Sequence, residues 1–165
     1  TGVSDGIRLY FNIIFMLLVF TALVALVNVL LGLFPDVFGA PLSADRILGW
    51  VFAPVVWLAG IPWSEATQAG SLMGLKTALN EVYAYDQLSR IGGDLSERTR
   101  LIMTYALCGF ANFSSVGILT GGLVAIAPSR REDILQLAPR ALISGTLATL
   151  MTGAAVGALP QSLFG

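Results

Sequence analysis

The sequence predicts an all-α fold: a polytopic bundle of membrane helices with a re-entrant helical hairpin, a broken transmembrane helix and an interfacial helix. Hydrophobic residues make up 56% of the 165 residues and charged residues only 12%, about half the charged fraction of a typical soluble domain. Stretches without charge cover residues 9–35, 101–129 and 141–165. Each is longer than the roughly 20 apolar residues that cross a bilayer core. Glycines, prolines and polar residues interrupt the remaining apolar sequence, and they locate the hairpin and the break.

Composition excludes several classes of function. The 9 basic and 10 acidic residues nearly cancel, which argues against a nucleic acid partner. The chain has no histidine and one cysteine, Cys108, so it offers no disulfide framework and no cysteine–histidine nucleophile. Glu81 is the only acid expected at mid-membrane, and no second carboxylate is near it. We therefore expect a protein that is not an enzyme and that holds no metal or cofactor in this segment.

Residues 1–36 predict one plain transmembrane helix. Its apolar part runs from Leu9 to Leu33 with few polar side chains, and Gly32 and Pro35 end it. The first residue is a threonine and the apolar helix follows almost at once. We therefore expect the chain to be a piece of a longer protein.

Residues 37–63 predict a helix, at about 43–60, that lies in the membrane interface. Prolines interrupt this segment, and tryptophan, which is enriched at membrane–water boundaries, recurs in it at nearly helical spacing. The tryptophans are Trp50, Trp57 and Trp63. A helix along the interface fits this pattern, with a full transmembrane span as the alternative.

Residues 64–89 are too polar for a helix that faces lipid, and they predict a re-entrant hairpin. The apolar runs at 68–75 and 82–88 are each too short to cross a bilayer. The polar residues between the two runs are Lys76, Thr77, Asn80 and Glu81. Irregular backbone at membrane depth is tolerated where it is buried in protein or lines a wet cavity, so we expect the tip of the hairpin to lie in such a place.

Residues 96–127 predict a transmembrane helix that is broken in its middle. Gly109 and Gly117 flank a polar stretch, and we expect the helix to break near 110–115. The polar residues of this stretch are Asn112, Ser114 and Ser115. A polar loop or short surface helix follows at 128–140. A final helix at 140–159 is rich in small residues, which let helices approach closely in a bundle.

Two charged residues of the hairpin require compensation, because a charge at the bilayer centre costs about 2.5–3.5 kcal/mol on insertion scales. Lys76 and Glu81 would neutralise each other in one interpretation. They are five residues apart, however, and a regular helix brings residues three or four apart together. In the other interpretation Glu81 accepts hydrogen bonds from a solute, and a carboxylate suits two neighbouring hydroxyl groups.

Other side chains on the two interrupted helices could complete a site for a polar solute. Asn80 and Asn112 offer both donors and acceptors, Ser115 lies one helical turn after Asn112, and Phe110 offers an aromatic face. Facing interrupted helices near the midplane are typical of secondary transporters.

Two motifs resemble the concentrative nucleoside transporter family. The segment GLKTALNEVYAY (Gly74–Tyr85) is similar to the family hallmark, and ALCGFANFSSVGI (Ala106–Ile118) is similar to its next signature. The order of elements agrees over nearly the whole chain, which resembles the C-terminal half of the family, its second inverted repeat. The chain departs from the family pattern at Val82–Tyr83, where Phe-Val is usual, and at Ser114, where glycine is common.

The resemblance implies an architecture and a mechanism. Residues 1–36 would form a scaffold helix for oligomerisation, 37–63 the interfacial helix, and 64–165 half of a transport domain. Such proteins are homotrimers in the plasma membrane, or the inner membrane of bacteria, and they move nucleosides by an elevator-type alternating access coupled to Na⁺ or H⁺. The ion site is expected in the missing first repeat, together with most recognition of the base, so neither the ion nor a pyrimidine or purine preference can be read here.

The resemblance also assigns roles to residues. Glu81 corresponds to the glutamate that binds the ribose hydroxyls, Asn112 and Ser115 to residues that hold the ribose, and Phe110 to a residue that contacts the nucleobase. Lys76 matches the motif lysine, which we assign only structural support. A channel or gated pore with a re-entrant filter hairpin is the alternative, because such hairpins also build selectivity filters.

Overall fold

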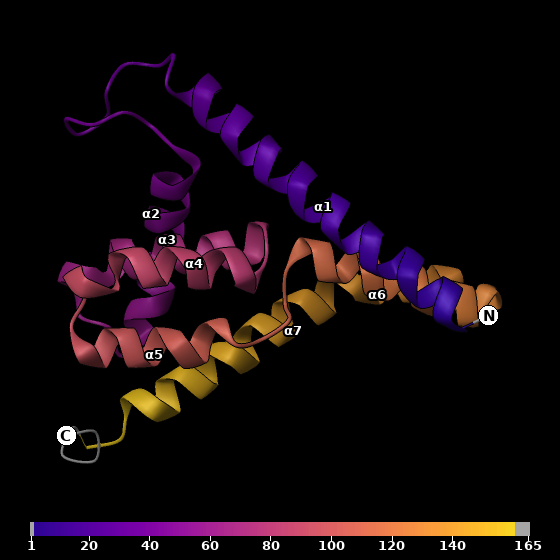
Figure 1. Cartoon of the computed structure of the whole chain (residues 1–165). Coiled ribbons are helices and arrows are strands. Elements are labelled where there is room, and N and C mark those ends of the chain that lie inside the picture. The colour runs from indigo at the N-terminus through magenta and orange to yellow at the C-terminus, as the bar shows by residue number, and fades with distance from the viewer. Residues whose placement is uncertain (1, 161–165) are drawn as a thin grey trace. The chain divides into compact units, whose positions relative to one another are not determined.

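The computed structural model describes residues 2–160 and consists of helices joined by turns and short loops (Figure 1). The helices are α1 (Gly2–Leu31), α2 (Ala44–Leu58), α3 (Trp63–Ala78), α4 (Glu81–Ile91), the short η1 (Gly92–Asp94), α5 (Glu97–Leu107), α6 (Phe113–Ile126), the short η2 (Pro128–Arg130) and α7 (Arg131–Gly157). The all-α fold predicted from the sequence is confirmed.

The first of two compact units covers Thr1–Ala44 and is formed by α1 and the loop that follows it. At 30 residues, α1 is about 45 Å long, enough to cross a bilayer core. In the loop, Phe38 and Gly39 both have positive φ angles, 52° and 76°, as a tight turn requires. The loop is tied back to the helix by Asn28, whose Oδ1 accepts a hydrogen bond from the backbone of Ala44 at 2.8 Å.

The second unit, Asp45–Gly165, has α3 at the centre of its core. This helix carries few charges and many small residues, and it packs against α4 and α5. Leu72 and Met73 of α3 are fully buried with Ile102 and Met103 of α5. Residues 72–76, in the second half of α3, are all buried, so the other helices cover this part of the segment that is too polar to face lipid.

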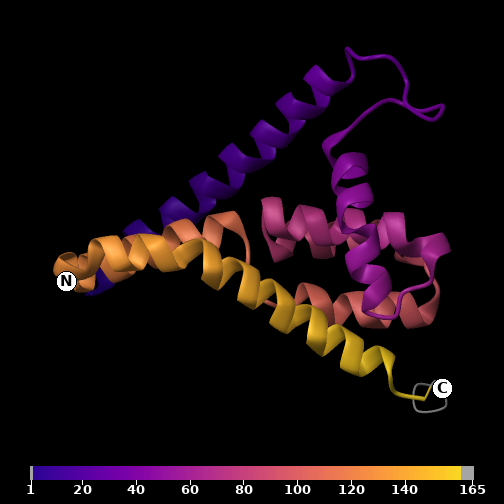
Figure 2. The same cartoon turned by 180° about the vertical axis from the view of Figure 1, so that it is seen from behind.

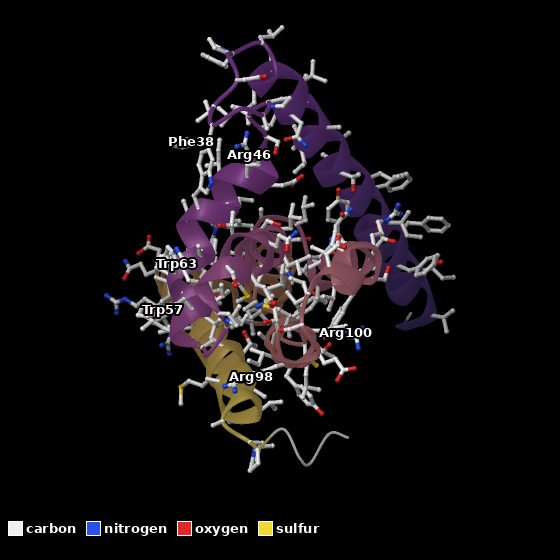
Figure 3. The ribbon with its side chains drawn as sticks, turned by 90° about the vertical axis from the view of Figure 1, so that its left-hand side faces the viewer. Phe38, Arg46, Trp57, Trp63, Arg98 and Arg100 are labelled. Atoms are coloured by element: carbon white, nitrogen blue, oxygen red, sulfur yellow. The ribbon has the colours of Figure 1, made fainter. Side chains whose placement is uncertain are left out.

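The chain turns sharply between α2 and α3, where the two helices are bent by 116°. Small residues allow the two backbones to approach: a Cβ atom on Gly70 would lie 2.6 Å from the carbonyl oxygen of Gly49. Trp57 and Trp63 lie on either side of the corner with their rings edge to face, 6.1 Å between centroids (Figure 3).

The last helix, α7, runs along both α5 and α6 (Figure 2). It starts at Arg131, so most of the segment expected to form a polar loop or short surface helix before a helix at 140 belongs to its first turns. Pro139 lies inside the helix, where proline is usually costly, and acidic residues in the first turn favour its N-terminus. Within the described residues, the segment Pro128–Gly157 is long and apolar enough to cross a membrane, and the bent α2–α3 pair would count as a second such span.

Both interruptions expected from the sequence are present. Only Leu79 and Asn80 separate α3 from α4, so Lys76 and Thr77 belong to the end of α3 rather than to the tip. The break between α5 and α6 covers 108–112, slightly earlier than expected. The reason is local, because Asn112 already caps α6 and the helix begins directly after it.

Candidate binding site at the hairpin tip and the helix break

The hairpin tip ends in an asparagine that starts the next helix. Asn80 has extended backbone angles, and its Oδ1 accepts a hydrogen bond from the backbone N–H of Tyr83 at 3.0 Å. This N-cap satisfies one of the free donors of the first turn. Glu81 is the first residue of α4 and is half-buried, so its carboxylate lies beside the positive end of its own helix.

The helix break ends in the same way, with a more complete cap. Oδ1 of Asn112 accepts a hydrogen bond from the backbone N–H of Ser115 at 2.7 Å, and Oγ of Ser115 accepts one from the backbone N–H of Asn112 at 3.1 Å. The Ser115 hydroxyl lies 2.9 Å from the carbonyl oxygen of Phe110 and 2.8 Å from that of Asn112, to which it can donate. This reciprocal capping box fixes Asn112, which is 1% exposed.

A direct hydrogen bond joins the tip to the break. Nδ2 of Asn112 donates to Oε2 of Glu81 at 2.9 Å, across 31 residues of sequence. Because Oδ1 of Asn112 is used by the cap, the amide is oriented with its donor group toward the carboxylate. Among the described residues no hydrogen bond reaches Oε1 of Glu81, so this oxygen can accept from a ligand. The N-termini of α4 and α6 both lie at this point, and their dipoles favour the negative charge.

Lys76 is fully buried beneath the tip. Its Nζ donates to Oγ1 of Thr149 on α7 at 3.5 Å. Within the described part of the chain no ion pair joins Lys76 to Glu81, although the Glu81 charge acts on Lys76 through space. Glu81 therefore bonds to Asn112, in contrast to the interpretation in which the two charges neutralise each other by direct contact.

An open groove of about 360 Å³ lies beside the break, between α6 and α7. Phe110, Ser115 and Thr149 contribute to its lining, which is otherwise mostly apolar. Phe110 is 65% exposed, so its aromatic side chain is available to a ligand. Ser114, in contrast, is buried and packs in the first turn of α6.

The structure places the expected site residues in three kinds of position. Glu81 and Asn112 touch directly, Asn80 and Ser115 cap the helices that carry them, and Phe110 lies at the edge of the groove. Thr149 was not singled out from the sequence, although it contacts Lys76 and lines the groove. It lies 73 residues after Lys76 in a helix of small residues, where threonine is an ordinary packing residue, so no local signal marks it.

Metal binding finds no support in the described residues, where no group of three or more histidine, cysteine, aspartate or glutamate side chains gathers.

Comparison with known proteins identifies the family. Residues 1–157 match the family model described as Na⁺ dependent nucleoside transporter C-terminus. The chain belongs to the concentrative nucleoside transporter family. It is 46% identical over 157 residues to a protein described as uncharacterized transporter YutK from Bacillus subtilis, a match that covers 94% of this chain and 39% of that protein. It is 43% identical to the nucleoside permease NupC of Helicobacter pylori, with 94% of this chain and 39% of the permease covered.

Solved structures of the family have the same fold. CNTnw in an inward-facing substrate-bound state aligns with a TM-score of 0.86 at 40% identity, covering 94% of this chain and 39% of CNTnw. A CNTnw variant in an outward-facing state aligns with a TM-score of 0.84. The family consists of membrane transport proteins and not of enzymes, and these relatives favour a transporter over a gated pore. The chain spans 39% of the length of each of these two bacterial relatives.

Proposed function

We propose that this chain is the C-terminal half of a cation-coupled nucleoside symporter, and that Glu81 and Asn112 bind the ribose of the substrate. The hydrogen bond between these two side chains is the observation that carries the proposal. It brings the tip of a hairpin and the break of a helix to one polar point within an otherwise apolar bundle.

The chemistry of this point favours a ligand that donates hydrogen bonds. The carboxylate of Glu81 accepts hydrogen bonds and cannot donate them while it is ionised. Asn112 occupies one of its oxygens and leaves room at both oxygens for further donors. The two neighbouring hydroxyl groups of a ribose match such an acceptor, and they would replace the water that a polar solute loses on entering the membrane.

The remaining site residues would complete the recognition of the nucleoside. Phe110 would contact the base from the edge of the groove, because its ring is exposed there. Asn80 would contribute its Nδ2 group beside Glu81, since its Oδ1 caps α4. Ser115 would act mainly by holding Asn112 in place. Lys76 and Ser114, both buried, would support the tip and the break from inside.

Transport would follow an elevator-type alternating access in a homotrimer in the plasma membrane, the inner membrane in a bacterium. Relatives solved in inward-facing and outward-facing states support two accessible states. Sodium is the better supported coupling ion, because the matching family model is described by its sodium dependence, and protons are the alternative. The ion site would lie in the first repeat. Residues 1–36 would then be a scaffold helix, 37–63 an interfacial helix and 64–165 half of the moving domain.

Nucleoside uptake by the full-length transporter carrying Glu81→Gln tests this proposal. Glutamine keeps the size of the side chain and removes its charge, so each hydrogen bond from a ribose hydroxyl loses its charge assistance. We expect KM to rise by about 10- to 100-fold, since hydrogen bonds to charged groups contribute about 1.5–3 kcal/mol.

The matched control is Asp86→Asn, an acid-to-amide change on the same helix. Asp86 forms an exposed ion pair with Arg90 at 3.0 Å, and exposed pairs of this kind contribute little. Uptake by the control should equal that of the wild type. A wild-type KM in the Glu81→Gln protein would remove Glu81 from the binding site.

A further inference from the structure

A single side chain of α7 contacts both the end of α3, just before the hairpin tip, and the helix break. Thr149 accepts the hydrogen bond from Nζ of Lys76, and it also packs against Gly109 at the break. A Cβ atom on Gly109 would overlap Cγ2 of Thr149. The hydroxyl group of Thr149 thus faces the hairpin and its methyl group faces the break.

The hydroxyl oxygen of Thr149 is oriented to accept a hydrogen bond from Lys76. It donates its own proton to the backbone carbonyl oxygen of Thr146 at 3.0 Å, one turn earlier on α7. Its lone pairs then remain for Lys76, whose ammonium group can only donate. This is the only hydrogen bond of the fully buried ammonium group within the described residues, and a buried charge without partners is strongly unfavourable.

The contact with Gly109 requires the absence of a side chain there. Gly109 lies in the break, three residues before Asn112, and Lys76 lies five residues before Glu81. A shift of Thr149 would therefore be passed to the tip through Lys76 and to the break through the backbone at Gly109.

We propose that Thr149 is a positioning residue that holds the hairpin tip and the helix break at the spacing in which Glu81 and Asn112 share a ligand. This rests on the proposed function. Thr149 acts mainly through its hydrogen bond with Lys76, and its methyl group packs against Gly109. Its effect is to align the two recognition groups rather than to bind the ribose itself.

The test measures uridine binding to purified full-length transporter by calorimetry, for Thr149→Val and Thr149→Ser. Valine keeps a methyl group against Gly109 and removes the acceptor for Lys76, whereas serine keeps the acceptor. We expect Thr149→Val to weaken binding by about 10-fold, as one hydrogen bond to a charged group allows, and Thr149→Ser to recover most of the affinity.

Thr152→Val is the matched control. Thr152 lies on the same helix, donates to the backbone carbonyl oxygen of Ala148 at 3.1 Å, and is exposed. The control should bind uridine as the wild type does. Equal affinity of Thr149→Val and wild type would overturn the proposal, as would equal weakening by Thr152→Val.

A double-mutant cycle with Lys76→Met separates positioning from general loss of stability. If Lys76 and Thr149 act as a pair, the effect of Thr149→Val on affinity should largely disappear in the Lys76→Met protein; additive effects would contradict the pairing. The same cycle on the thermal unfolding midpoint gives a readout without ligand. Failure of the wild type to bind any nucleoside would refute the proposed function instead, and the unfolding cycle would then still decide whether the pair exists.

Discussion

The hairpin tip and the helix break both cap the following helix with an asparagine, but the two asparagines make different further contacts. Each interruption ends in an asparagine with extended backbone whose Oδ1 caps the next helix. At the break, Ser115 completes a reciprocal box, and Nδ2 of Asn112 reaches Glu81. At the tip, the cap bond to the backbone of Tyr83 is the one hydrogen bond that the Asn80 side chain makes among the described residues. In the described part of the chain, the side chain of Asn112 thus bonds through both its oxygen and its nitrogen, whereas that of Asn80 bonds through its oxygen alone.

The two regions also differ in the charged residues that they carry. Lys76 lies at the end of α3 and Glu81 directly follows the tip, whereas residues 108–112 of the break are uncharged. The break therefore supplies an oriented hydrogen-bond donor, and the start of α4 supplies the charged acceptor. A polar site inside an apolar bundle needs both, because removing an ionised acceptor from water is costly unless fixed partners bond to it.

The largest effect is expected at the break. Asn112→Ala removes the cap and the donor to Glu81 together, which should cost about 1 kcal/mol for the cap and about 1.5–3 kcal/mol for the charge-assisted bond. Thermal unfolding of the full-length transporter and uridine calorimetry would measure both losses.

Asn112→Ser divides these two functions. Serine caps helices well but is too short to reach Glu81, so only the cap's share of the stability, about 1 kcal/mol, should return, while uridine affinity stays as low as in Asn112→Ala. Recovery of affinity together with stability would show that Asn112 only holds the helix.

A smaller effect is expected at the tip. Asn80→Ala should lower the free energy of unfolding by about 1 kcal/mol through loss of the cap, and Asn80→Ser should restore it. Uridine affinity of Asn80→Ser should fall about 3-fold, the effect of one neutral hydrogen bond. If calorimetry gave a loss as large as that of Asn112→Ser, the difference between the two corners would be disproved.

Much of this arrangement is predictable because its signals are local. Polar residues between short apolar runs locate the hairpin, and glycines around Asn112 locate the break. The motif resemblance correctly placed the chain in its family. The contact between Glu81 and Asn112 joins residues that are far apart in the sequence. The sequence alone supports this contact only through the resemblance to the family.

Other features could not be read from the sequence. The partner of Lys76 depends on how α7 packs, and nothing near Thr149 distinguishes it from the other small residues of its helix. The sequence predicts a loop or a short surface helix before the last helix, because charged residues and Pro139 interrupt the apolar pattern, yet one continuous helix runs through them. The role of Ser115 as the partner of Asn112 becomes visible only when the backbone geometry is known.

The most direct test of the shared ribose site is a cycle in which protein and ligand are both altered. Calorimetry would compare uridine with 2′,3′-dideoxyuridine, which lacks both ribose hydroxyls, on wild-type and Glu81→Gln full-length transporter. We predict that the wild type prefers uridine by about 10- to 100-fold and that Glu81→Gln binds the two ligands with nearly equal affinity. An undiminished preference for uridine in Glu81→Gln would show that the hydroxyls are recognised elsewhere.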